Sequence, residues 1–129
     1  MKKQTIAINT PYTRKDVYGA LAVPIYNNVA FEFDDAQEMA DAFCNRIKAP
    51  DYARVENPTV TNLEQRVKAL TGAEHVTAFN SGMAAIGNAL LAATEQGKNI
   101  VTSHHLFGNT LALITTTLTR FGVEPRLID

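Results

Sequence analysis

The feature that most constrains this chain is the stretch of residues 76–91, VTAFNSGMAAIGNALL. Its first residues are typical of a short buried strand, and Ser81 and Gly82 lie in a tight turn before a helix rich in small residues. The first turn of such a helix has unpaired backbone N–H groups, and the helix dipole favours negative charge there. The stretch therefore predicts either an anion-binding turn or an ordinary strand–helix unit in which Met83 and Ile86 are core residues.

Strand and helix patterns alternate throughout the second half of the chain. Asn57 and Pro58 are typical of a helix start, and Gly72 is typical of a helix end. The predicted elements that follow are strands at 75–79, 99–103 and 123–128 and helices at 82–95 and 109–121, the last with an apolar stripe of Leu111, Ile114, Leu118 and Phe121. Such alternation favours parallel pairing. We therefore expect an α/β fold: an N-terminal arm followed by part of a mostly parallel sheet with helices on both faces.

Residues 1–57 differ in character from the rest and are predicted to form the arm. They have few periodic apolar positions, apart from a helix that begins at Asp34 or Asp35 and runs to about Phe43. Residues 51–56 are polar and are followed by Asn-Pro, which disfavours the helical region. We expect an extended loop there.

The composition is that of a soluble globular protein, with 46% hydrophobic and 19% charged residues among 129. The net charge of −1 provides no basic surface for nucleic acid or an anionic membrane. No apolar run approaches the roughly 20 residues that span a bilayer, and the N-terminus does not resemble a signal peptide. The single cysteine, Cys44, is predicted to be buried and fits a reducing cytoplasm, where we expect the protein.

Several common types of site are excluded by their motifs. The chain has no G-x-x-x-x-G-K-[ST] loop and no G-x-G-x-x-G turn. Ser81 lies in N-S-G-M rather than in the G-x-S-x-G elbow of a serine hydrolase. His104 and His105 are adjacent, so their rings would point to opposite sides of an extended chain. We therefore expect a polar pair there and no metal site.

The remaining candidates are of kinds that suit a phosphate. They are the helix start at residues 81–83, the pair Tyr52 and Arg54, and the aromatic Phe107 after the next strand. Glycine permits a close backbone approach, and arginine offers a planar fork of donors. Phe107 should lie near the carboxyl edge of the sheet, where α/β folds bind ligands. Taken singly, each residue also has a purely structural interpretation.

Together these pieces resemble the Cys/Met-metabolism pyridoxal-phosphate enzymes, in the order found in that family. The family includes cystathionine γ-synthase, cystathionine γ-lyase, methionine γ-lyase and the O-acylhomoserine sulfhydrylases. The combination of Y-x-R-x-x-N-P-T with S-G-M-A-A is its most specific part. The matching segments are Pro24-Ile25-Tyr26, Tyr52-Ala53-Arg54-Val55-Glu56-Asn57-Pro58-Thr59 with Leu63-Glu64, Ser81-Gly82-Met83-Ala84-Ala85-Ile86, and Leu106-Phe107-Gly108-Asn109-Thr110.

The resemblance implies the type I fold of pyridoxal-phosphate enzymes, here incomplete. Residues 1–57 would form the arm for oligomerisation and cofactor contact, and residues 58–129 the first part of the cofactor-binding domain. Pyridoxal 5′-phosphate would be the cofactor. Its phosphate would be held at Ser81, Gly82 and Met83, the last two through backbone N–H groups.

The resemblance also implies partners. Tyr52 and Arg54 would reach the phosphate of a cofactor in a neighbouring subunit, so we expect a homo-oligomer, either a dimer or a tetramer. The expected substrate is a small amino acid of the O-acylhomoserine type, and neither nucleic acid nor a membrane is an expected partner.

Two positions depart from the family pattern. Phe107 stands where most relatives have a tyrosine that stacks on the pyridine ring, and Asn109 replaces a common glycine. A phenyl ring still stacks, but it has no hydroxyl with which to donate a hydrogen bond or move a proton. Phe-Gly-x-Thr favours an O-acetyl- or O-succinylhomoserine sulfhydrylase. Cystathionine γ-synthase and the methionine or cystathionine γ-lyases are the alternatives.

The family's Schiff-base lysine lies downstream of these motifs. The lysines of this chain do not match its motif: Lys2, Lys3, Lys15, Lys48, Lys68 and Lys98. We therefore assign no catalytic residue and expect the 129-residue chain alone to be inactive. An alternative of another class is a non-catalytic phosphate-binding or structural α/β module.

Overall fold

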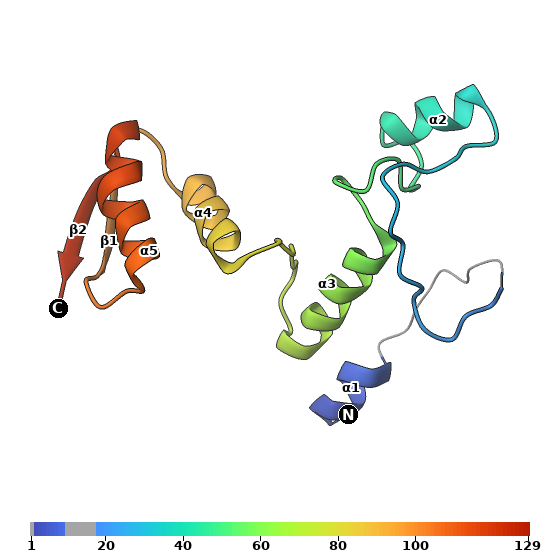
Figure 1. Cartoon of the computed structure of the whole chain (residues 1–129), viewed down its shortest axis with the longest axis horizontal. Coiled ribbons are helices and arrows are strands. Elements are labelled where there is room, and N and C mark those ends of the chain that lie inside the picture. The colour runs from blue at the N-terminus through green and yellow to red at the C-terminus, as the bar shows by residue number, and fades with distance from the viewer. Residues whose placement is uncertain (1, 10–17) are drawn as a thin grey trace. The chain divides into compact units, whose positions relative to one another are not determined.

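The computed structural model describes residues 2–9 and 18–129, which fall into two compact units, Met1–Ala78 and Phe79–Asp129. Figure 1 shows the first unit in blue to green and the second in yellow to red. The first unit contains helices α1 (Lys3–Asn9), α2 (Ala36–Phe43) and α3 (Pro58–Thr71). The second contains α4 (Gly82–Ala93), β1 (Asn99–Ser103), a helical run that starts with α5 (Gly108–Ala112), and β2 (Glu124–Ile128).

Helix α3 begins and ends where the sequence predicts. The Asn57 side chain accepts a hydrogen bond from the Thr59 N–H at 2.9 Å, and Pro58 is the first helical residue. Gly72 ends the helix in the left-handed conformation, with φ of 74°. The guanidinium of Arg66 donates to the Ala7 carbonyl at 3.0 Å, so α3 is fixed to α1 beside it.

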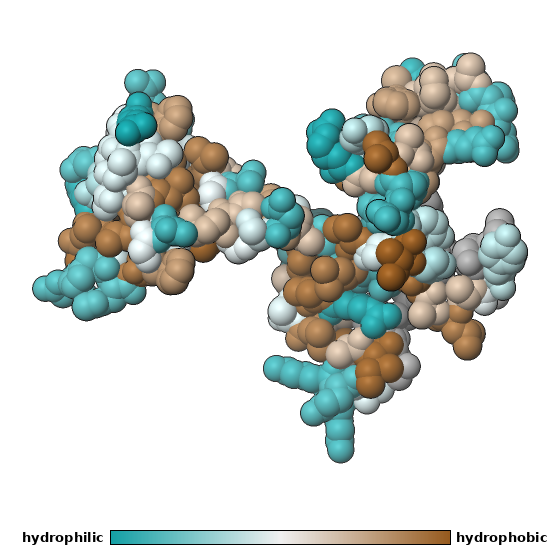
Figure 2. Space-filling model, in the orientation of Figure 1, coloured by the Kyte–Doolittle hydropathy of each residue, from teal (hydrophilic) through white to brown (hydrophobic). Residues whose placement is uncertain are grey.

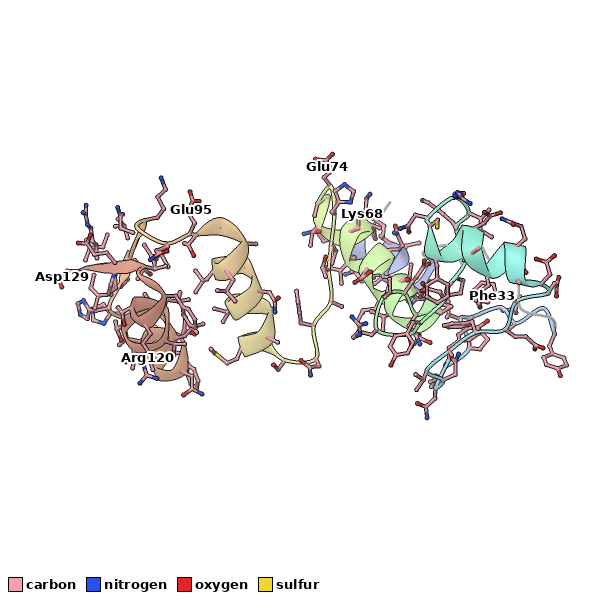
Figure 3. The ribbon with its side chains drawn as sticks, turned by 90° about the horizontal axis from the view of Figure 1, so that it is seen from above. Phe33, Lys68, Glu74, Glu95, Arg120 and Asp129 are labelled. Carbon is pink, nitrogen blue, oxygen red and sulfur yellow. The ribbon has the colours of Figure 1, made fainter. Side chains whose placement is uncertain are left out.

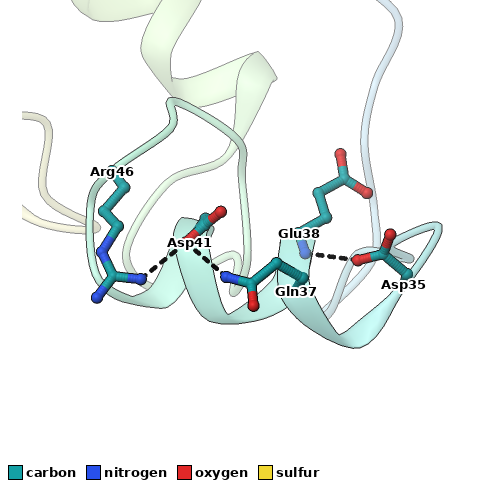
Figure 4. A network of polar contacts seen from close by, with 5 residues as sticks. All are labelled: Asp35, Gln37, Glu38, Asp41 and Arg46. Carbon is teal, nitrogen blue, oxygen red and sulfur yellow. Dashed lines mark hydrogen bonds and ion pairs between the residues drawn. The ribbon is translucent and has the colours of Figure 1, made fainter.

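Helix α2 is stabilised by polar contacts at both ends, which Figure 4 shows. The Asp35 carboxylate caps the start by accepting from the Glu38 N–H at 2.7 Å. Near the other end, Asp41 forms an ion pair of 2.9 Å with Arg46 and accepts a hydrogen bond from Gln37. The predicted start at Asp35 is confirmed. The prediction that Cys44 is buried is wrong, because this residue follows the last helical turn and is exposed.

The second unit is built on a parallel strand pair. β1 and β2 pair in parallel from Asn99 opposite Glu124 to Ser103 opposite Ile128. The helical run between them buries Ile114 and Leu118. Val123, just before β2, is buried as well. This unit confirms the predicted α/β class, with two strands that run parallel because a helix connects them.

The connecting helix is irregular, and this changes the predicted apolar stripe. α5 continues into a π-helical turn, Leu113–Thr117, and then a 3₁₀ turn, Leu118–Phe121. A π-helical turn is wider than an α-helical one and shifts the face on which later residues lie. Phe121 is therefore exposed, whereas the predicted stripe would have buried it.

The strand predicted at residues 75–79 does not form. These residues have no strand pairing in the described part of the chain, and the Ala78 N–H donates instead to the Glu64 carboxylate at 2.8 Å. The apolar residues at this position could not specify a strand by themselves, because a strand requires a neighbour that supplies backbone partners. The predicted three-stranded sheet is thus a two-stranded one in this structure.

Both units expose apolar side chains, as Figure 2 shows. In the first unit, exposed apolar residues include Ile25 and Leu63, and in the second they include Phe107 and Leu127. Figure 3 labels Glu95, which follows α4 and pairs with Lys98 at 3.7 Å. No helix in the described ranges has the length and apolar character needed to cross a membrane.

Candidate functional site: the start of helix α4

The start of α4 has the geometry that the sequence predicts. Ser81 is in an extended conformation and caps the helix: its Oγ accepts from the Ala84 N–H and its carbonyl from the Ala85 N–H, both at 3.1 Å. The N–H groups of Gly82 and Met83 have no partner within the helix, because the carbonyls four residues before them lie outside it. Two donors of the first turn are thus left for a ligand.

Space around Gly82 is open. Gly82 is exposed, and a Cβ atom built on it would meet no other atom within 4 Å. The first turn of α4 has no acidic residue. Uncharged N–H donors, the serine hydroxyl and the positive end of the helix dipole together suit a phosphate group. The donor set therefore fits the phosphate of the expected cofactor.

Phe107 lies where the chain enters α5, four residues after the end of β1. Its carbonyl accepts from the N–H groups of Thr110 and Leu111 at 2.9 and 3.1 Å. Its ring packs little against the protein, since the residue is 77% exposed. The ring is consequently available to stack on a flat ligand.

A hollow lies between α4 and the helical run that starts with α5. It has a volume of about 440 Å³ and is shallow and broadly open to solvent. Met83 contributes from α4, and the remaining lining comes from Asn109, Ala112, Leu113, Thr116 and Thr117. Asn109, which replaces a glycine common in the family, thus lies beside one of the predicted cofactor-binding residues.

Tyr52 and Arg54 lie in the first unit, on a turn rather than in the predicted extended loop. The Tyr52 carbonyl accepts from the N–H groups of Val55 and Glu56, which closes the turn. Asp51 fixes its start by accepting from the Tyr52 N–H at 2.6 Å. Tyr52 itself forms an isolated antiparallel bridge with Ala30, so the extended prediction is wrong only for the turn at residues 53–55. The restraint imposed by the following proline applies to Asn57, which is extended, and not to those residues.

The turn presents Tyr52 and Arg54 together. The Arg54 guanidinium lies over the Tyr52 ring, 5.4 Å from its centre, within the range of a cation–π contact. Both residues are exposed, and Arg54 takes part in no ion pair within the described part of the chain. Its positive charge therefore remains available for an anion.

The start of α3, which follows this turn, is attached to residues 24–26. Asn57 is buried and donates from its side chain to the Tyr26 carbonyl at 2.9 Å. The Thr59 hydroxyl donates to the Pro24 carbonyl at 3.0 Å and accepts from the Tyr26 N–H at 2.9 Å. We refer to these contacts among Pro24, Tyr26, Asn57 and Thr59 as the Asn57 clamp. Sequence reasoning missed this role, although all four residues lie in the matching segments.

His104 and His105 form a polar pair, but the prediction that their rings point to opposite sides is wrong, because their ring centres are 3.9 Å apart. The pair follows the end of β1, where the chain is no longer a regular strand. His104 Nδ1 lies 3.1 Å from the Asp129 carboxylate. Among residues 2–9 and 18–129, no group of three or more histidine, cysteine, aspartate and glutamate side chains could hold a metal ion.

The predicted site residues are divided between the two units. Tyr52 and Arg54 share the turn in Met1–Ala78, and the start of α4 and Phe107 belong to Phe79–Asp129. Within the second unit, sequence reasoning missed Thr110, which contacts both Met83 at the start of α4 and Phe107. Its signal was the threonine in the Leu106–Thr110 segment, a polar residue that the structure buries.

Comparison with known proteins gives consistent results. Residues 4–129 match the model of the family described as Cys/Met metabolism PLP-dependent enzyme. An L-methionine γ-lyase from Fusobacterium nucleatum is 40% identical over 117 residues, which is 91% of this chain. An O-acetyl-L-homoserine sulfhydrylase from Corynebacterium glutamicum is 41% identical over 107 residues, which is 83% of this chain.

A solved structure from Campylobacter jejuni, named as an O-acetylhomoserine (thiol)-lyase, has the same fold over the whole chain, with a TM-score of 0.89 and 34% identity. That structure contains N′-pyridoxyl-lysine-5′-monophosphate. The present chain spans 30% of the length of the γ-lyase, 24% of the sulfhydrylase and 31% of the solved chain. Because the family model covers almost all of its sequence, this chain belongs to the Cys/Met metabolism family of pyridoxal-phosphate-dependent enzymes.

Proposed function

We propose that the start of α4 binds the phosphate of pyridoxal phosphate in an enzyme that acts on γ-substituted amino acids. The observation that carries this proposal is the exposed first turn of α4, where Gly82 and Met83 present N–H groups and Ser81 caps the helix. A helix start of this kind is a ready-made anion site. Membership of a pyridoxal-phosphate-dependent family supports this choice of anion.

Each residue has a defined task in this proposal. Gly82 and Met83 donate backbone hydrogen bonds to phosphate oxygens, and Ser81 adds its hydroxyl. Phe107 covers one face of the pyridine ring and excludes water from it. When bound, the cofactor supplies an electron sink for the amino acid carbons. Phe107 has no hydroxyl, so a proton that a tyrosine would move at this position is moved by another group.

Tyr52 and Arg54 belong to the proposal as ligands of a second phosphate. Arg54 has an exposed guanidinium held over the Tyr52 ring, on a turn fixed by Asp51. We propose that the pair binds the cofactor phosphate of a neighbouring copy in a homo-oligomer. In functional terms, residues 1–57 then form an arm and residues 58–129 the first part of the cofactor-binding domain.

For the reaction we propose γ-replacement, in which sulfide or a thiol displaces the acyl group of an O-acylhomoserine. The support is Phe107-Gly108-Asn109-Thr110 and the 41% identity to a sulfhydrylase. A γ-lyase reaction on methionine is the second candidate, and it is supported by 40% identity to a methionine γ-lyase. A cytoplasmic location accompanies either reaction and rests on the single cysteine.

The two reactions have different products. Replacement converts O-acetylhomoserine and sulfide into homocysteine and acetate, whereas elimination converts methionine and water into methanethiol, ammonia and 2-oxobutanoate. We expect the 129-residue chain to form neither set, because none of its lysines matches the family's cofactor lysine. With the lysine-bearing part supplied as a second polypeptide, homocysteine would support replacement, and methanethiol would support the γ-lyase.

Cofactor binding is tested with pyridoxine 5′-phosphate and pyridoxine. Neither ligand has an aldehyde, so neither can react with surface lysines and obscure the result. We expect the chain to bind the phosphorylated ligand at least about tenfold more tightly, because charge-assisted hydrogen bonds to the phosphate are lost with pyridoxine. Inorganic phosphate should compete with pyridoxine phosphate in the same titration.

Other outcomes of this titration would support a non-catalytic phosphate-binding or structural α/β module. Binding of inorganic phosphate with no preference for the pyridine ring would support a phosphate-binding module without a cofactor. The proposal is wrong if calorimetry detects no binding of either ligand by a chain that circular dichroism shows to be folded. A structural α/β module would then be the better description.

A further inference from the structure

We infer that Thr110 is a positioning residue that holds the start of α4 in register with Phe107. This inference rests on the proposed function, because it concerns how the phosphate-binding and ring-stacking parts of that same site are kept together. The Ser81 cap orders the start of α4 internally but does not connect it to Phe107, which is exposed at the entry to a helix of five residues.

Burial distinguishes Thr110 from its neighbours. Among the described residues, the buried polar residues are Asn57 and Thr110, each 9% exposed. A hydroxyl removed from water carries a cost unless it has a partner. Asn57 forms the clamp in the first unit, and Thr110 has a comparable place in the second.

Thr110 contacts both parts of the site. Its N–H donates to the Phe107 carbonyl at 2.9 Å, which fixes the backbone from which the Phe107 ring projects. Its hydroxyl donates to the Met83 sulfur at 3.7 Å. Met83 is the second residue of α4. The backbone of Thr110 thus contacts the stacking residue, and its side chain contacts a residue proposed to donate to the phosphate.

A second contact lies one turn further along the same two helices. A Cβ atom on Gly87 would come within 3.9 Å of the Leu113 side chain, so the two helices approach closely there. Met83 and Gly87 are four residues apart on α4, and Thr110 and Leu113 are three apart on the helical run. Both spacings place residues on one helix face. The Thr110–Met83 contact is therefore the end of a seam that reaches the start of α4.

The contact between the Thr110 hydroxyl and the Met83 sulfur orients the Met83 side chain but adds little stabilising energy, because a thioether sulfur is a weak acceptor. Met83 has a flexible, unbranched side chain that adopts many conformations unless it is held. Thr110 restricts those conformations, and the contact between the two side chains links the first turn of α4 to the first turn of α5, next to Phe107. Losing the hydroxyl should thus affect phosphate binding more than folding.

The test compares three variants of the full 129-residue chain. Thr110→Val keeps the shape and removes the hydroxyl, and Thr110→Ser restores the hydroxyl. Thr115→Val is the matched control, because the Thr115 hydroxyl donates only to the Leu111 carbonyl within its own helix, at 2.9 Å. For each, the affinities for pyridoxine phosphate and pyridoxine are measured, together with the amide NMR signals of Gly82 and Met83 in the ligand-free chain.

We expect Thr110→Val to weaken pyridoxine phosphate binding about two- to threefold, the lower end of the range for one hydrogen bond because the acceptor is a thioether, with a smaller effect on pyridoxine. The Gly82 and Met83 amide signals should shift. Thr110→Ser should restore both properties, and Thr115→Val should leave both unchanged.

Three different results would overturn the inference. If the unmodified chain prefers pyridoxine phosphate and Thr110→Val keeps that preference and the same amide signals, Thr110 is not a positioning residue and the proposed function stands. If the unmodified chain shows no preference for the phosphorylated ligand, the proposed function fails and the inference fails with it. Equal losses in Thr110→Val and Thr115→Val would also contradict the inference, since they would reflect general loosening.

Discussion

Ser81 has two tasks at the start of α4, and one substitution separates them. As N-cap it satisfies the Ala84 N–H, and as a ligand it would face the phosphate. Aspartate is an equally good N-cap, so Ser81→Asp should change the free energy of unfolding by less than about 0.5 kcal/mol. Its negative charge should nevertheless reduce the affinity for pyridoxine phosphate at least about tenfold. Urea unfolding and titration calorimetry measure the two effects.

The matched control is Asp35→Ser, the reverse exchange at the cap of α2. It should change neither the stability nor the affinity appreciably, since α2 has no place in the proposed site. Unchanged phosphate binding in Ser81→Asp would show that the phosphate does not lie at this helix start.

Phe107 offers a complementary prediction, because its contribution concerns the ring and not the phosphate. Phe107→Ala should weaken pyridoxine and pyridoxine phosphate by the same factor, about two- to tenfold, which is the range for one lost aromatic contact. Phe121→Ala is the control, since Phe121 is also exposed but ends the helical run. A loss confined to the phosphorylated ligand would contradict the stacking role.

At the scale of elements, the Asn57 clamp explains why a proline-containing motif follows Tyr52 and Arg54. Asn57→Ala removes an N-cap and also removes the hydrogen bond from the Asn57 side chain to the Tyr26 carbonyl. We expect a loss of about 2–3 kcal/mol in unfolding free energy, of which about 1 kcal/mol is the cap. Asp35→Ala removes an exposed cap alone and should cost about 1 kcal/mol. Equal losses in urea unfolding would argue against the clamp.

The elements that the sequence predicted correctly are those decided within one turn of the chain. Asn57-Pro58, Gly72 and Asp35 determine helix ends through contacts with residues two to four positions away. β1 and β2 were also predicted, and they form because each strand is the parallel partner of the other within the same chain. These sequence signals were therefore sufficient to predict the α/β class.

The elements that the sequence did not predict depend on more distant partners or on irregular geometry. Residues 75–79 have the composition of a strand but no described partner, and Glu64 takes one of their N–H groups. The π-helical turn Leu113–Thr117 has no clear sequence signal and removes Phe121 from the apolar stripe. In the candidate site, the start of α4 was predicted, whereas Thr110 was not, because its role depends on a contact between two helices.

At the scale of the whole molecule, the proposal that Tyr52 and Arg54 act in a neighbouring copy predicts complementation. Arg54→Ala and Ser81→Asp chains should each bind pyridoxine phosphate weakly. In a mixed dimer, one site would combine an intact Arg54 from one copy with an intact Ser81 from the other. Unfolding and refolding the two variants together should therefore restore about a quarter of the sites.

Calorimetry of the mixture, with sedimentation to measure its assembly state, checks this prediction. Each variant refolded with itself is the control and should regain no binding. A mixture that sediments as an oligomer but regains no binding would show that Arg54 does not act between copies.

Amide NMR of the chain during a titration with pyridoxine phosphate shows whether the start of α4 holds the cofactor phosphate. We expect the largest changes on the Gly82 and Met83 N–H signals, because hydrogen bonds to a phosphate strongly shift the amides that donate them. Pyridoxine should leave these two signals nearly in place while it shifts those around Phe107. If the changes are of equal size along the chain, or if the Gly82 and Met83 signals stay fixed while pyridoxine phosphate binds, the phosphate does not lie at the start of α4.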